Sequence, residues 1–179
     1  MSAHRRLSDP KFLVAHFPLN NHARDVSGHG NNGTVTGATY IEGPFNGRSV
    51  MRSDGTDDKV ACGNIGTVRT IAFWVNPDTT TEELILLVAG SDIMVSSGTI
   101  TYATVTASAT YVNGELSTTL VADVWQHVVC VLSADVAASA FGLANDGTNY
   151  GDCDLADVRA YNVALTGDEI QAVMQMDGR

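Results

Sequence analysis

Acidic residues are the first candidates for chemistry, because glycoside hydrolysis needs two carboxylates about 5 to 9.5 Å apart across the scissile bond. Glu82 and Glu83 are adjacent, so on a strand their side chains would point to opposite faces. Asp152, Asp154 and Asp157 cluster without an aromatic platform beside them, which is typical of a solvated loop or a metal-ligating turn. The acidic residues therefore do not indicate a glycosidase.

Other catalytic patterns are also missing from the sequence. No Gly-x-Ser-x-Gly turn and no phosphate loop followed by Lys-Ser/Thr occurs. His127 lies inside an apolar run and is typical of a hydrogen-bonded structural histidine, while the spacing of His16, His22 and His29 does not fit a transition-metal site. We therefore expect a protein that is not an enzyme.

One loop is rich in hard oxygen donors. Residues 25–33 read DVSGHGNNG. The glycines let backbone carbonyl groups turn inward, and Asp25 with the neighbouring asparagines adds side-chain oxygens, which is the shell that calcium prefers. Loops of this composition are also common as plain turns. A distant carboxylate converging on the loop would favour calcium.

The elements that must position these residues are short strands. Runs of β-branched and aromatic residues alternate with Gly, Asn, Asp or Pro every eight to twelve residues, which predicts an all-β protein of two packed sheets. Asn113 and Gly114 favour a type I′ hairpin turn between two runs. The predicted strands are 12–17, 34–41, 48–52, 59–61, 70–75, 84–89, 93–95, 100–105, 109–112, 116–121, 126–132, 140–143 and 155–161.

One helix is expected near the C-terminus, from Gly167 to Met176. Thr166 followed three residues later by Glu169 is a capping box. Residues 12–179 would form the domain, and residues 1–11, which carry local positive charge, would form an N-terminal arm that either binds a partner or is a frayed terminus.

Composition restricts the partners. The chain has 179 residues, a formal net charge of −10 and 44% hydrophobic residues, which fits one domain and argues against nucleic acid. No apolar run approaches the roughly 20 residues that span a bilayer, so we expect no membrane insertion. Cys62, Cys130 and Cys153 are an odd number at unrelated spacings, which favours free thiols and a reducing compartment.

Several segments together resemble one family. They are 13–19 (LVAHFPL), 25–38 (DVSGHGNNGTVTGA), 54–60 (DGTDDKV), 70–75 (TIAFWV), 111–115 (YVNGE), 125–128 (WQHV), 155–165 (LADVRAYNVAL) and 168–170 (DEI). In this order they resemble the laminin-G-like, concanavalin A-like jelly-roll domains, over about residues 12–174. The resemblance implies an antiparallel two-sheet sandwich with one short C-terminal helix.

The resemblance also implies a structural calcium ion between the early loop and a late strand. On this chain Asp25 and Asp157 would supply carboxylate oxygens, and Asn31 or a neighbour a backbone carbonyl. Such an ion would stabilise the fold without taking part in catalysis. Lys59 and residues 133–135 depart from the family's aromatic positions, so no ligand-binding residue can be named for a sugar.

Three functions follow, in order of preference. The first is a non-catalytic attachment or decoration protein on a larger assembly such as a bacteriophage virion, which is assembled in the host cytoplasm. Such a protein would bind to a capsid or tail lattice, would form a homo-oligomer and could adhere to surface glycans. The second is a stand-alone extracellular carbohydrate-binding module. The third, disfavoured by the missing carboxylate pair, is a jelly-roll glucanase.

Overall fold

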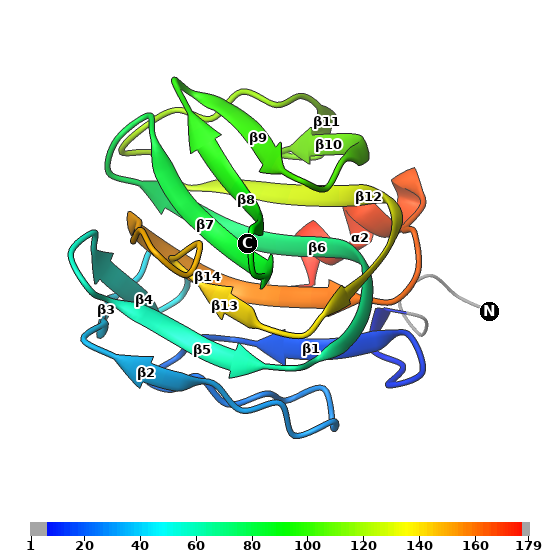
Figure 1. Cartoon of the computed structure of the whole chain (residues 1–179), viewed down its shortest axis with the longest axis horizontal. Coiled ribbons are helices and arrows are strands. Elements are labelled where there is room, and N and C mark those ends of the chain that lie inside the picture. Colours follow the sequence, from blue (N-terminus) through cyan, green and yellow to red (C-terminus); the bar gives the residue numbers. More distant parts are fainter. Residues whose placement is uncertain (1–6, 177–179) are drawn as a thin grey trace.

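The computed structural model, which describes residues 7–176, is a sandwich of two antiparallel sheets with one helix outside it (Figure 1). This confirms the predicted all-β, two-sheet architecture. The eight-stranded sheet has the order β11-β10-β12-β6-β14-β4-β3, with β1 also paired to β14. Its strands are β1 (Leu13–Phe17), β3 (Thr39–Glu42), β4 (Ser49–Asp54), β6 (Gly66–Pro77), β10 (Ala107–Val112), β11 (Glu115–Leu116), β12 (Gln126–Ala138) and β14 (Asp152–Tyr161).

The second sheet has six strands in the order β2-β5-β13-β7-β8-β9 and lies in front of the first in Figure 1. Its strands are β2 (Thr34–Thr36), β5 (Lys59–Gly63), β7 (Glu82–Val88), β8 (Ser91–Ser96), β9 (Thr99–Ala103) and β13 (Phe141–Leu143). The main core fills the space between the sheets, where Phe17 and Phe141 stack with ring centroids 6.2 Å apart. Apolar burial between two sheets is the dominant stabilising term in such a fold.

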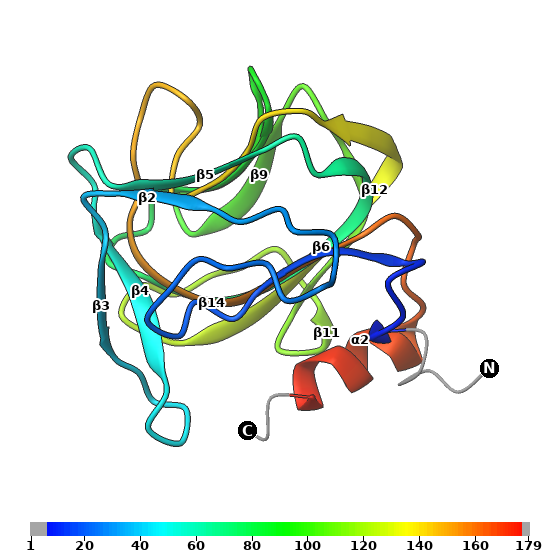
Figure 2. The same ribbon diagram turned by 90° about the horizontal axis from the view of Figure 1, so that it is seen from below.

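The helix α2 (Gly167–Gln175) covers part of the outer face of the eight-stranded sheet (Figure 2). The predicted capping box is confirmed: the backbone N–H of Glu169 donates to Thr166 Oγ1, and that of Thr166 donates to Glu169 Oε2. Ile170 and Val173 pack against the sheet in a second cluster that includes Leu7, which is fully buried. Leu7 therefore packs on the domain, although sequence assigned it to the arm; residues 1–6 of that arm lie outside the described residues.

Local turn chemistry explains where the strands begin and end. Asn113 and Gly114 both have positive φ, and Val112 pairs with Glu115 across them, which confirms the predicted hairpin. The prediction of one continuous strand over 34–41 is wrong. The chain turns at Gly37 (φ 69°) and passes from one sheet to the other, so the segment forms two strands, β2 and β3. A Cβ at Gly37 would lie 1.8 Å from Asp58 Oδ1, so a side chain could not fit there.

The cysteines are free, as predicted, with Cys130 and Cys153 buried and Cys62 half-buried. Burial raises the pKa of each thiol to about 12, which favours the protonated form at neutral pH. Among residues 7–176, no helix is both long and apolar enough to cross a membrane.

Candidate functional site

Aromatic side chains gather on the outer face of the eight-stranded sheet, in the part that α2 leaves uncovered. Trp74 on β6 and Trp125 just before β12 both contact Phe45, whose ring centroid lies 5.3 Å and 5.0 Å from theirs. His127 on β12 lies beside Trp74, with centroids 5.1 Å apart. Trp74 and Trp125 remain partly exposed. This group of four is called the aromatic patch below.

The strand pattern explains why these rings share one face. On β6, Phe73 and Val75 point into the core, so Trp74 and Asn76 point outward. Trp74 is paired with His127 on one side and with Ala156 of β14 on the other, and cross-strand partners lie on the same face. Phe45 comes from the loop between β3 and β4, which projects from the same face of the sheet as α2 (Figure 2).

A polar row continues the aromatic patch along the same face. Arg52 of β4 lies 3.4 Å from Asp154 and 3.4 Å from Asp78, and 3.7 Å from Asp152. Asn76 Nδ2 donates to Asp154 Oδ2 at 3.2 Å. The row thus places one guanidinium among three carboxylates beside partly exposed indole rings, and its net charge is negative.

Burial dominates the electrostatics of this row. The pKa of Asp154 is raised, chiefly by burial and also by Asp152 and Asp78, while hydrogen bonding to Asn76 and the charge of Arg52 act in the opposite direction. The pKa of Asp152 is raised for the same first reason. The sequence-based assignment of Asp152, Asp154 and Asp157 to a solvated loop or turn is wrong, because all three lie on β14 and two of them are buried.

The loop predicted to bind calcium is held by backbone groups of the loop itself and of β1. Asp25 Oδ1 accepts N–H groups of His16 (3.0 Å) and Ser27 (2.9 Å), and Oδ2 accepts that of Asn31 (2.9 Å). Asn31 Nδ2 in turn donates to the carbonyl of Val14. Burial alone would raise the pKa of Asp25, but its hydrogen bonds to Ser27, His16 and Asn31 outweigh burial and lower it.

Asp157, the distant carboxylate of that prediction, is engaged by basic side chains. Its Oδ2 lies 2.9 Å from Arg159 Nη2, and its Oδ1 lies 2.6 Å from His16 Nε2. His16 therefore connects the two predicted ligands, through its backbone to Asp25 and through its imidazole to Asp157. In this arrangement a cation on Asp157 would lie beside the buried guanidinium of Arg159. Calcium at this place stays a prediction from the sequence.

Sequence reasoning did not identify the aromatic patch. The alternation of Phe73, Trp74, Val75 and Asn76 already places the tryptophan and the amide on one face of a strand. Phe45 lies in a loop about 30 and 80 positions from the two tryptophans, and no local pattern predicts which face that loop covers. Only the register of β4, β6, β12 and β14 brings these residues together.

No family model matches the sequence, and no curated protein matches it. Among solved structures, domain 4 of AbnA, an extracellular GH43 arabinanase of Geobacillus stearothermophilus solved with arabinotriose, superposes with a TM-score of 0.63 at 17% identity, over 91% of this chain and 98% of that one. The ligand-binding domain of botulinum neurotoxin serotype D with N-acetylneuraminic acid gives 0.57 at 15% identity, over 96% and 52%.

A third structure, Trypanosoma rangeli sialidase with the inhibitor DANA, gives a TM-score of 0.64 at 13% identity and covers 93% of this chain but 34% of the sialidase chain. This chain therefore spans about a third to a half of the sialidase and neurotoxin chains, and almost all of the arabinanase domain. These likenesses show a shared β-sandwich fold. Membership of the laminin-G-like family in particular stays a prediction.

Proposed function

We propose that this chain is a carbohydrate-binding β-sandwich module, and that the sugar lies on the aromatic patch beside the polar row. One observation carries the proposal. Trp74 and Trp125 are partly exposed on the face of the sheet that α2 leaves uncovered, and the side chains of Arg52, Asn76 and Asp154 lie beside them on the same face. Sugar sites combine aromatic surface with a few fixed polar groups in this way. The arabinotriose complex of the arabinanase domain supports the proposal at the level of the fold.

The charge of the polar row favours a neutral oligosaccharide over a sialylated one. Asp78, Asp152 and Asp154 surround Arg52, which is already paired with all three. An anionic sugar would meet net negative charge on this face and would lack a free guanidinium. Neutral hydroxyl groups, in contrast, can donate to the carboxylates and accept from Asn76.

The test is a glycan array followed by calorimetry on the purified full chain. We expect neutral oligosaccharides among the hits, and Trp125→Ala to weaken their Kd at least tenfold. Val26→Ala, a truncation at a side chain that is 53% exposed and belongs neither to the aromatic patch nor to the polar row, serves as the matched control and should leave Kd unchanged. An array without hits, or equal weakening by both variants, would overturn the proposal.

The proposed module binds its sugar without catalysis, as the sequence led us to expect. Hydrolysis of any bound oligosaccharide by the purified chain would contradict this. Display on a virion lattice, homo-oligomerisation and the choice between a virion and an extracellular location stay predictions from the sequence.

A further inference from the structure

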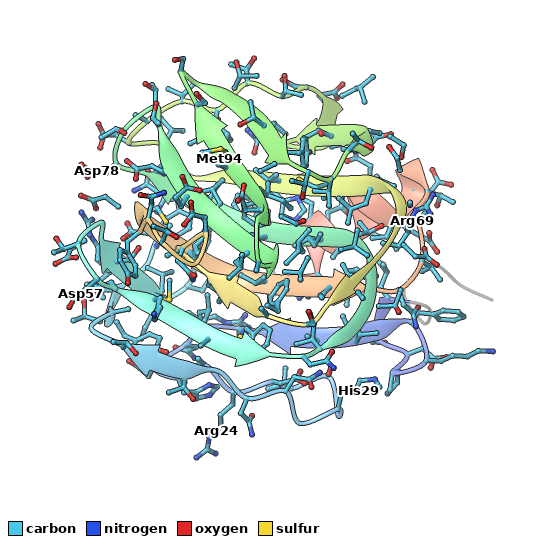
Figure 3. The ribbon with its side chains drawn as sticks, in the orientation of Figure 1. Arg24, His29, Asp57, Arg69, Asp78 and Met94 are labelled. Atoms are coloured by element: carbon cyan, nitrogen blue, oxygen red, sulfur yellow. The ribbon has the colours of Figure 1, made fainter. Side chains whose placement is uncertain are left out.

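Three carboxylates, two from adjacent strands and one from a loop later in the chain, meet on the outer face of the six-stranded sheet. Glu83 lies on β7, Asp92 on β8 and Asp146 in the loop between β13 and β14, and a carboxylate oxygen of each lies within 4.8 Å of the other two. Glu83 is paired with Met94 across β7 and β8, and cross-strand partners share a face. Met94 lies on β8 in the front sheet of Figure 3, so this group is on the opposite side of the sandwich from the aromatic patch.

The loop that carries Asp146 is fixed to β7. The backbone N–H of Ala144 donates to the carbonyl of Leu84 at 2.8 Å, and that of Gly151 donates to the carbonyl of Ala144 at 2.9 Å. A Cβ at Gly151 would lie 2.1 Å from the carbonyl oxygen of Glu83, so only glycine lets the chain approach β7 this closely. The loop backbone at 148 and 149 also donates to Asp146 Oδ1. The third carboxylate is therefore held in place by the fold.

Two of these carboxylates are buried with oxygens that accept no hydrogen bond. Glu83 is 9% exposed and Asp92 is 6% exposed, yet Glu83 Oε2 and Asp92 Oδ1 have no partner. Within residues 7–176, the ion pairs formed by lysine, arginine and histidine do not include Glu83, Asp92 or Asp146. A buried carboxylate oxygen without a donor is unfavourable unless the group takes up a proton or a cation neutralises it.

Electrostatic repulsion among the three carboxylates also favours the binding of a cation. Burial raises the pKa of Glu83 to about 7, and the charges of Asp146, Asp92 and Glu82 add to the increase. Burial and then Asp146 also raise the pKa of Asp92, while a backbone hydrogen bond from Ala103 acts in the opposite direction. A cation bound between the three groups would remove this repulsion and supply the missing partner.

We propose that Glu83, Asp92 and Asp146 bind one calcium ion. Three converging carboxylates supply hard oxygen donors, and calcium accepts the irregular geometry that two strands and a loop provide, whereas magnesium demands a near-ideal octahedron. The site differs from the one that the sequence predicted, because Asp25 and Asp157 are engaged by protein donors, whereas Glu83 Oε2 and Asp92 Oδ1 have no donor. The ion would connect β7 and β8 to the loop before β14.

The experiment measures calcium binding to the full chain by calorimetry after treatment with a chelator, together with melting curves with and without calcium. We expect about one ion per chain and a higher Tm with calcium. The double variant Glu83→Gln, Asp92→Asn removes two charges but keeps the side-chain shapes. It should weaken the Kd for calcium at least tenfold and abolish the increase in Tm.

The Tm of the same double variant in chelator shows whether the variant folds normally. Because it relieves repulsion between unpartnered buried carboxylates, its Tm in chelator should equal or exceed that of the unchanged chain, which a purely structural role for these groups would not give. Asp57→Asn is the matched control, since Asp57 is an exposed residue at the edge of the molecule (Figure 3) and belongs to a separate acidic group with exposed Asp54 and buried Asp58.

Three outcomes would overturn the proposal. They are an absence of calcium binding at millimolar concentration, unchanged calcium binding in the double variant, and loss of binding in Asp57→Asn or Asp25→Asn with retention in the double variant. The last outcome would place the ion at another acidic group or in the loop that the sequence indicated.

Discussion

Two acidic regions of this molecule are built in opposite ways. Around His16, the carboxylates of Asp25 and Asp157 receive backbone N–H groups, an imidazole and a guanidinium. At Glu83 and Asp92, two carboxylates are buried, and one oxygen of each has no hydrogen-bond donor. The difference teaches that an acidic cluster indicates an external cation only when the fold leaves its charge uncompensated. We call these the compensated and the uncompensated region.

The largest effect is expected in the compensated region, from Arg159→Met. Arg159 is 4% exposed, pairs with Asp157 and donates to the carbonyl of Val173 in α2. Removing one partner of a buried pair leaves the other charge buried, which costs about 3 to 5 kcal/mol. Urea unfolding followed by circular dichroism should show this loss; a change below about 1 kcal/mol would mean that Asp157 is compensated by something else.

A smaller loss, about 1 to 2 kcal/mol, is expected for Asp25→Asn at pH 7, because charge-assisted hydrogen bonds from the backbone are replaced by neutral ones. The pKa of Asp25 is lowered in the folded chain. Its contribution is therefore present above the unfolded pKa of 3.8 and is lost as pH falls through the lower folded value.

The difference in unfolding free energy between Asp25→Asn and the unchanged chain should thus be constant from pH 7 to about pH 5 and should shrink below pH 4. Unfolding measured at several pH values in chelator checks this. A difference that instead disappears at pH 7 when calcium is removed would show that the sequence-based calcium prediction is correct and would break the comparison.

In the uncompensated region, Asp92→Asn alone in chelator should cost nothing or stabilise the chain by up to about 1 kcal/mol, since it removes repulsion and a buried charge. Melting curves in chelator measure this. A loss of 2 kcal/mol or more would show that Asp92 has a favourable partner and would make the two regions alike.

The smallest effect is expected at an exposed acidic residue. Asp57 is exposed, so Asp57→Asn should change the unfolding free energy by less than about 0.5 kcal/mol, with or without calcium. The same melting curves provide the measurement. A larger change would mean that the exposure of a carboxylate does not indicate how much it contributes to the stability of this chain.

Local features of the fold were predictable, whereas the sites were not. The Asn113-Gly114 hairpin and the Thr166–Glu169 capping box are short-range patterns, and both occur as predicted. The break at Gly37 was missed, because β2 and β3 pair with different sheets and their pairing partners are distant in sequence. Residues 117–121 were predicted to extend a strand that ends at Leu116, since β propensity alone does not say where pairing partners end.

The sites depend on long-range register. Asp25 and Asp157 were selected for metal binding from residue type, but residue type does not report whether an arginine lies beside the carboxylate. Glu83, Asp92 and Asp146 are separated by 9 and 54 positions and follow no period. They meet because β7 pairs with β8 and because the loop before β14 crosses β7.

The position of β14 has a consequence for the order in which the protein can fold. This strand lies between β6 and β4 and also pairs with β1, yet it comes near the end of the described chain. During synthesis, β1, β4 and β6 are made before β14, so they cannot form their pairings with β14 until residues 152–161 have been added. Such distant pairings make folding slow and leave strand edges open to other chains. We expect this protein to depend on chaperones during synthesis more than a helical domain of equal length.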